Sequence, residues 1–137
     1  MRVMAIDYGD ARIGLAFSDL TATMCGEAFT ITEYSIEKAI SRIAQEIKAR
    51  EVSKIVLGLP KNMDGSEGAR AEISRNLAER LEAETGLPVR LWDERLTSVS
   101  AHAVLHANGR KMKDHRKKVD AVAASIILEG FLDSGKN

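Results

Sequence analysis

The sequence predicts one α/β domain, in which helices flank a five-stranded mixed sheet made of an antiparallel hairpin meander followed by parallel strands. Three observations favour this class. Short apolar runs separated by turn-forming residues fill the first thirty positions, which is typical of hairpins. Apolar runs then alternate with segments of helical period, as in β-α-β crossovers. No internal repeat, and no linker long enough to divide residues 1–137, interrupts this order.

Antiparallel strands are expected first. Residues 2–6 and 13–17 are apolar runs joined by the turn formers of 7–10, and residues 28–31 supply a third strand. Residues 36–47 carry isoleucine and alanine at the i, i+3, i+4 and i+7 spacing of an amphipathic helix, with charged residues between them.

The second half alternates strands and helices, because its apolar runs change period repeatedly. The expected elements are a buried parallel strand at 54–59 closed by Pro60, a helix marked by Ile73, Leu77, Ala78 and Leu81 that stops at Gly86, a strand at 89–93, and helices at 98–107 and 119–132. Parallel strands end at one edge of a sheet, and ligands bind at that edge.

Composition excludes several classes of protein. The 20 Lys and Arg residues balance 20 Asp and Glu residues, which excludes a globally basic coat protein and an acidic disordered tail. Six aromatic residues are too few for a surface that binds single strands mainly by stacking. The one cysteine, Cys25, excludes an internal disulfide and a cysteine-rich zinc site. No apolar run approaches the roughly 20 residues of a membrane span, and Asp7 comes too early for a signal peptide, so we expect a cytoplasmic protein without a membrane partner.

Three acidic residues stand where the predicted fold would gather them at one sheet edge. Asp7 ends the first strand, Glu94 follows the last, and Asp120 begins an apolar helix with almost no polar face. Each has a structural alternative: a turn residue for Asp7, a helix cap shared with Asp93 for Glu94, and an acid favoured by the helix dipole for Asp120. Burying an unpaired carboxylate costs several kcal/mol, so Asp120 requires a rim, a partner or a cation.

Convergence of these three acids would create a metal site. Carboxylates without a histidine or cysteine partner suit Mg²⁺ or Mn²⁺ rather than zinc. Two such ions about 4 Å apart can activate a water and stabilise the leaving oxygen of a phosphodiester. The acids therefore predict a metal-dependent nuclease, with Asp7, Glu94 and Asp120 as both metal ligands and catalytic residues.

The neutral total charge conceals a basic segment at 110–118, which holds six basic residues and one acid. Composition alone leaves a solvated loop as the alternative. The segment directly precedes Asp120, where positive charge would hold a phosphate backbone without reading bases. The candidate substrate-binding residues here are Arg110, Lys111, Lys113, Arg116, Lys117 and Lys118.

Other motifs carry less weight. Loop 60–70 leads into a helix N-terminus that could hold a phosphate, but a turn at Asp64-Gly65 followed by a helix cap is the simpler interpretation. His102 and His106 are one helical turn apart, yet the residues between them lack the glutamate of a zinc protease.

Four motifs occur along the chain in a specific order. They are Ile6-Asp7-Tyr8-Gly9 with Arg12-Ile13-Gly14; Val56-Leu57-Gly58-Leu59-Pro60 with Asn62-Met63-Asp64-Gly65; Asp93-Glu94-Arg95-Leu96-Thr97; and Val119-Asp120 followed by Ala123-Ala124. In these motifs the sequence resembles the YqgF/RuvX family, which comprises pre-16S ribosomal RNA nucleases and Holliday-junction resolvase-like proteins. The resemblance covers nearly the whole chain.

The resemblance implies a ribonuclease H-like fold, catalysis by the three acids already singled out, and Mg²⁺- or Mn²⁺-dependent processing of the 5′ end of pre-16S ribosomal RNA. It also implies that Arg12, Asn62 and Arg95 line the substrate groove. The chain departs from the family where Ala11 replaces a residue that is often basic, which would remove one phosphate contact, and where no proline precedes the third strand.

Other functions stay open at this point. One is resolution of branched DNA. A junction resolvase needs two active sites to make paired cuts, so the oligomeric state bears on this alternative, and we expect a monomer or a weak homodimer. Another is a non-catalytic module that binds nucleic acid. A third, a nucleotide-binding ATPase domain, would need two lobes to enclose its ligand.

Overall fold

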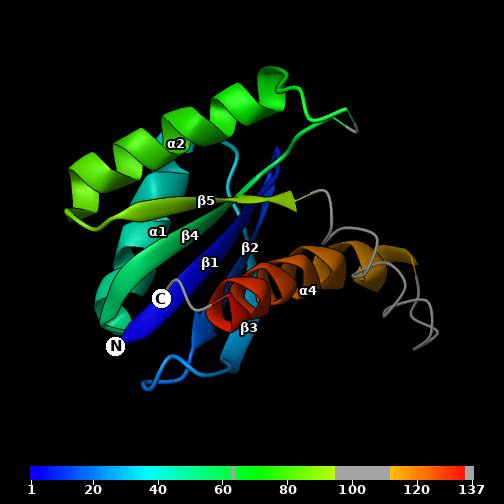
Figure 1. The fold of residues 1–137 in the computed structure, drawn as a ribbon. Helices are drawn as coiled ribbons and strands as arrows, with labels where there is room; N and C mark the ends of the chain where they lie inside the picture. Colours follow the sequence, from blue (N-terminus) through cyan, green and yellow to red (C-terminus); the bar gives the residue numbers. More distant parts are fainter. Residues whose placement is uncertain (63, 95–111, 135–137) are drawn as a thin grey trace.

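The computed structural model describes residues 1–62, 64–94 and 112–134, and it places the side chains of the first two ranges and of 121–134. Strands and helices follow the predicted order (Figure 1). In chain order they are β1 (Arg2–Tyr8), β2 (Arg12–Ser18), β3 (Cys25–Thr32), α1 (Ile36–Ala49), β4 (Val52–Leu59), α2 (Ala69–Thr85), β5 (Val89–Asp93) and α4 (Met112–Asp133).

The five strands form one mixed sheet in the order β3-β2-β1-β4-β5. Strand β2 pairs antiparallel with both β1 and β3, whereas β4 runs parallel to both β1 and β5. The predicted five-stranded mixed sheet is therefore confirmed. Strands β1, β4 and β5 end at the same edge, and α4 begins on that side of the molecule (Figure 1).

Helices cover both faces of the sheet, and β1 divides its side chains between them. Met4 and Ile6 are buried in a core with α1 and α2, and Tyr8 packs against the same core. Val3 and Ala5 are buried in a second core with α4. The period of two places Asp7 on the α4 face and Tyr8 on the α2 face.

Local signals explain where α1 and α2 begin and end. The side chain of Ser35 accepts a hydrogen bond from the backbone N–H of Lys38, which caps α1. Helix α2 ends at Gly86, whose φ of 71° lets its N–H reach the carbonyl of Glu82. The prediction that Ile73 belongs to the apolar face of α2 is wrong, because this side chain is 46% exposed.

Helix α4 differs from the sequence prediction at its start. The apolar pattern predicts a helix from residue 119, but the structure has helix from Met112, so residues 112–118 are not a loop. Lysine, arginine and methionine are good helix formers, and no glycine or proline interrupts 112–129. The predicted helix at 98–107 lies outside the described residues. Within the described ranges, no helix is long and apolar enough to cross a membrane.

Candidate active site

Asp7 stands at the edge where the parallel strands end. It is the next-to-last residue of β1 and pairs across the antiparallel ladder with Gly14. Its neighbour Ile6 pairs with Leu57 of β4, which brings Asp7 beside Gly58. Because Ala5 is buried under α4, Asp7 projects on the same face, next to that core.

Glu94 directly follows β5, whose last residue, Asp93, pairs with Leu59. The Glu94 carboxyl is half-buried and hydrogen-bonded to the Asp7 carboxyl. Burial, the hydrogen bond with Asp7 and the negative charge of Asp7 together raise the pKa of Glu94 well above its usual value, whereas the charge of Arg70 acts in the opposite direction. The two predicted acids are therefore brought together, although they are 87 positions apart.

Gly58 makes this meeting possible. A β-carbon at position 58 would lie 2.5 Å from Oε1 of Glu94 and 2.7 Å from its Cγ and Cδ. Val56, two residues earlier, is buried under α4, so a side chain at position 58 would point to that same face. The missing side chain leaves the space through which Glu94 crosses β4 toward Asp7.

This acid pair fits a hard divalent cation. Two carboxyls at hydrogen-bonding distance must share a proton unless a positive charge lies between them. Oxygen ligands of this kind are those that Mg²⁺ and Mn²⁺ prefer. In the part of the chain that the structure describes, no cluster of three potential ligands is found. Asp120, the predicted third ligand, belongs to the first half of α4, where the backbone is placed and the side chain is outside the described set.

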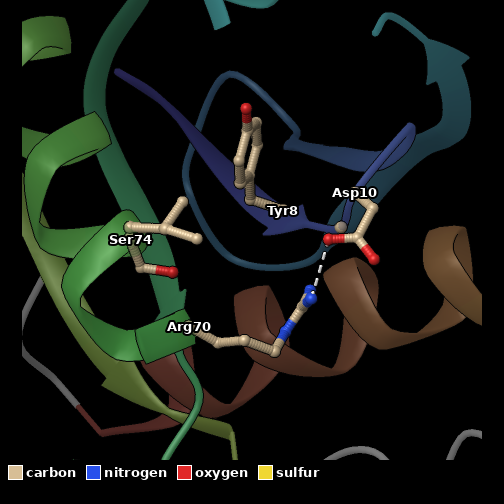
Figure 2. A pocket seen from close by; sticks show the side chains of 6 residues that line it. Tyr8, Asp10, Arg70 and Ser74 are labelled. Atoms are coloured by element: carbon tan, nitrogen blue, oxygen red, sulfur yellow. Dashed lines mark hydrogen bonds and ion pairs between the residues drawn. The ribbon is translucent and has the colours of Figure 1, made fainter. Parts of the chain in front are cut away.

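Arg70 adds positive charge beside the acids. It lies in the first turn of α2, and its Nη1 donates to Oδ1 of Asp10 at 2.9 Å (Figure 2). Its charge also acts on Glu94, lowering the pKa of that carboxyl against the larger effect of burial. Sequence reasoning did not single out this residue. Its signal is a basic residue in a first helical turn, where the helix dipole disfavours positive charge.

The remaining predicted substrate residues are only partly placed. Arg12 begins β2 and is exposed. Asn62 is exposed in the β4–α2 loop, and its Nδ2 donates to Oγ of Ser66 at 3.0 Å. Gly65 has a φ of 88°, and its N–H donates to the carbonyl of Asn62, so the turn predicted at Asp64-Gly65 is present. Asn62 therefore also stabilises the β4–α2 loop through its hydrogen bonds with Gly65 and Ser66.

The predicted basic segment is described only in its backbone. Lys113, Arg116, Lys117 and Lys118 belong to the first turns of α4, on the side where the parallel strands end (Figure 1). Their side chains are outside the described set. Arg95, Arg110, Lys111 and the two histidines His102 and His106 lie outside the described residues.

A mixed sheet of order β3-β2-β1-β4-β5 with helices on both faces is the ribonuclease H-like fold. Solved structures agree on the fold. The chain is similar to Thermus thermophilus RuvC in complex with a Holliday junction (TM-score 0.64, 13% identity, 100% of this chain and 97% of that one). It is also similar to the Fowlpox virus resolvase in complex with Holliday junction DNA (TM-score 0.65, 12% identity, 100% of both chains).

Sequence comparison identifies the family. The family model described as "RuvX: Holliday junction resolvase" matches residues 1–134. A relative from Anaeromyxobacter sp. (strain K), named "Putative pre-16S rRNA nuclease", is 43% identical over 133 residues, which is 97% of each chain. A relative of the same name from Thermoanaerobacter pseudethanolicus is 43% identical and covers 100% of this chain and 99% of its own. The chain belongs to the RuvX family.

Proposed function

We propose that this protein is a metal-dependent nuclease that hydrolyses phosphodiester bonds in processing the 5′ end of pre-16S ribosomal RNA in the cytoplasm. The observation that carries the proposal is the hydrogen-bonded pair of carboxyls, Asp7 and Glu94, at the edge where β1, β4 and β5 end. Asp7, Glu94 and Asp120 are the proposed catalytic residues and ligands of Mg²⁺ or Mn²⁺. Family membership and the names of the relatives support the reaction class.

The chemistry follows from the donor set. A pair of bound divalent ions would supply an activated water and a positive charge for the leaving oxygen. Asp7 lies near the end of β1 and Glu94 directly follows β5, and both strands pair parallel with β4 between them, so the two carboxyls are held in position before any ion arrives. Burial and the neighbouring Asp7 raise the pKa of Glu94 without a cation, and the closeness of the two carboxyls would favour ion binding, because the ion replaces the shared proton.

Positive groups around the acids would hold the substrate backbone. Arg70 lies beside the acid pair, and the basic residues of 110–118 precede Asp120 in the sequence. Phosphate contacts of this kind give affinity that does not depend on base sequence and that falls as salt rises. Arg12, Asn62 and Arg95 are the proposed groove residues, and Arg70 is added to them on structural grounds.

Two kinds of nucleic acid are candidate substrates. The names of the curated relatives favour a ribosomal RNA precursor, whereas the description of the family favours a Holliday junction. A junction resolvase needs two sites acting together to make paired cuts, so the protein's solution mass bears on the choice. We favour the RNA precursor and a monomer or weak homodimer.

The test offers a pre-16S RNA fragment with its 5′ extension and a four-way DNA junction to wild type and to Asp7→Asn, with Mg²⁺, Mn²⁺ or EDTA. We expect wild type to cut the RNA only with metal and Asp7→Asn to lose at least a hundredfold in rate. Asp133→Asn, which removes an exposed carboxylate at the far end of α4, is the matched control. Full cleavage by Asp7→Asn contradicts the proposal, and salt-sensitive binding without cleavage identifies a non-catalytic module.

A second readout is independent of turnover. Without metal, the charge of Asp7 adds to the burial that makes Glu94 take up a proton on folding. Asp7→Asn removes that charge, so we expect the variant to melt at a higher temperature than wild type in EDTA. Mg²⁺ should raise the melting temperature of wild type by binding the folded state, and it should raise that of the variant much less. Equal responses to Mg²⁺ would show that the ion does not bind at Asp7.

A further inference from the structure

A small cavity of about 150 Å³ lies between the end of β1 and the first turns of α2 (Figure 2). It is near the acid pair but on the other side of β1, because Tyr8 points to the α2 face and Asp7 to the α4 face. The lining residues come from the end of β1, the β1–β2 turn and α2, and they are Tyr8, Gly9, Asp10, Arg70, Ile73 and Ser74.

Apolar groups form two walls of the cavity. Tyr8 is only partly buried and presents its ring, while its hydroxyl points away from Asp10 and Arg70 (Figure 2). Ile73 is 46% exposed, although isoleucine in an amphipathic helix is usually turned into the core. An aromatic ring and an aliphatic side chain left open beside one cavity form a surface that a flat apolar ligand would cover.

The hydroxyl of a largely buried serine faces the same space. Ser74 is 2% exposed, and across the described ranges its hydroxyl makes no hydrogen bond. The hydroxyl points from α2 toward the gap between that helix and β1 (Figure 2). Its oxygen is not among the buried side-chain atoms that lack a partner, so water in the cavity can reach it. A ligand that displaces this water would have to replace its hydrogen bond to Ser74.

The ion pair between Asp10 and Arg70 at the rim of the cavity can separate at little cost in free energy. The side chain of Arg70 is 54% exposed and that of Asp10 is 91% exposed, and an ion pair so accessible to water contributes little to stability. A ligand can therefore take the place of either partner. A bare phosphate would meet the carboxylate of Asp10 at this rim, whereas a ligand with both donors and acceptors would satisfy both charged groups.

Apolar walls, a serine hydroxyl and a rim of both charges are the features that receive a planar heterocycle with polar edges. We propose that this cavity binds one unstacked nucleobase of the substrate strand, with Tyr8 and Ile73 against its faces and Ser74 at its edge. This inference rests on the proposed function, because it takes the substrate to be nucleic acid. Arg70 lines the cavity and its charge also acts on Glu94, so the bound base belongs to a nucleotide near the bond that is cut.

The test is a scan of abasic positions in the RNA substrate, with binding measured in EDTA so that no cleavage intervenes. Wild type should lose about tenfold in affinity when one particular base near the cleavage site is removed and much less at other positions. Ile73→Glu places a charge on the cavity wall at an exposed helix position, which leaves folding intact. It should bind intact RNA about as weakly as wild type binds the abasic RNA and show no further loss at that position.

Further variants test the cavity and control for effects of charge and of folding. Ala83→Glu adds the same charge at an exposed position of α2, about 15 Å along the helix, and should behave as wild type does. Ser74→Ala should reduce discrimination among the four bases at the sensitive position while leaving the melting temperature within a few degrees of wild type. If one of these substitutions unfolds the protein, as judged by its melting temperature, Tyr8→Leu takes its place. Tyr8→Phe is then the matched control, because it keeps the aromatic ring.

The failure of this inference and the failure of the proposed function give different results. If wild type loses affinity equally at every abasic position, or if the losses from Ile73→Glu and from the missing base add, the cavity does not bind a base. Metal-dependent cleavage that requires Asp7 would then still stand. If wild type binds neither RNA nor branched DNA, both proposals are overturned.

Discussion

The carboxyl of Glu94 lies where the side chain of residue 58 would be, so that Gly58 and Glu94 share one space on the α4 face of the sheet. The carboxyl reaches Asp7 only through this space. Replacing Gly58 therefore changes the acid pair without touching either acid.

We expect Gly58→Ala to lower cleavage by about a hundredfold, because the new methyl group displaces Glu94 by about 1 Å or more. Overpacking of this kind also lowers the free energy of unfolding by about 1–3 kcal/mol. Gly26→Ala in β3 is the matched control, since a β-carbon there would meet its nearest atoms at 3.6 Å or more. Cleavage rates and urea unfolding compare the two variants, and a fully active Gly58→Ala would disprove the steric argument.

The raised pKa of Glu94 gives the metal-free protein a pH dependence of definite sign. Burial and then Asp7 raise this pKa above its ordinary 4.5, so the folded state binds a proton that the unfolded state releases. In EDTA the free energy of unfolding should fall as pH rises from about 5 toward 8, because that window lies above the unfolded value. Glu94→Gln should flatten this slope. Saturating Mg²⁺ should flatten it in wild type, and a slope unchanged by both would contradict the assignment.

Arg50, which caps the end of α1, joins the helix to the antiparallel strands. Its guanidinium lies 4.6 Å from the ring centre of Phe17 and 5.1 Å from that of Phe29, and it pairs with Glu27 at 2.9 Å. We expect Arg50→Ala to lower the free energy of unfolding by about 2 kcal/mol, through lost stacking and hydrogen bonds. Thermal and urea unfolding measure the change.

Arg75 provides the comparison for Arg50. It makes two hydrogen bonds to a single carboxylate, that of Glu67, at 2.7 Å each, but the pair is open to water and stacks on none of the rings that the structure describes. Arg75→Ala should therefore destabilise the protein much less than Arg50→Ala. Equal effects would mean that the aromatic contacts of Arg50 contribute nothing.

Asp19 gives a test of stability in acid. Its carboxylate accepts hydrogen bonds from the hydroxyl of Thr21 at 2.7 Å, from the N–H and hydroxyl of Thr23, and from the N–H of Met24. These bonds hold the pKa of Asp19 well below its ordinary 3.8, so they stabilise the fold above that value and are lost as pH falls through the lowered pKa. Asp19→Ala should destabilise the protein at about pH 6, with a difference that narrows below about pH 3. A constant difference would contradict this origin.

Strands were predicted from sequence to within a few residues because each is a short apolar run between turn formers. The start of α4 was missed because residues 112–118 were interpreted by charge, whereas their helix propensity decided the structure. Asp7 and Glu94 were found because acids at the ends of parallel strands must approach one another. Gly58 was missed, although a glycine within an apolar strand is a known sign of close approach.

The cavity could not be predicted from sequence. Tyr8 and Ile73 are 65 positions apart, and the sequence placed Tyr8 among the turn formers of 7–10 and Ile73 on the apolar face of its helix. Only the packing of α2 against the sheet shows that both are partly open beside one cavity. Arg70 was missed for the same reason, because its role depends on neighbours that the order of residues does not reveal.

The side chains of Asp7 and Tyr8 point to opposite faces of the sheet, and this limits which insertions and deletions β1 can accept during evolution. Inserting or deleting one residue within β1 would exchange the two faces, turning an aromatic ring toward Glu94 and a carboxylate into the core beneath α2. Both the acid pair and the cavity would be lost in a single event. Variation in length among related chains should therefore be found in the connecting loops and be absent from this strand.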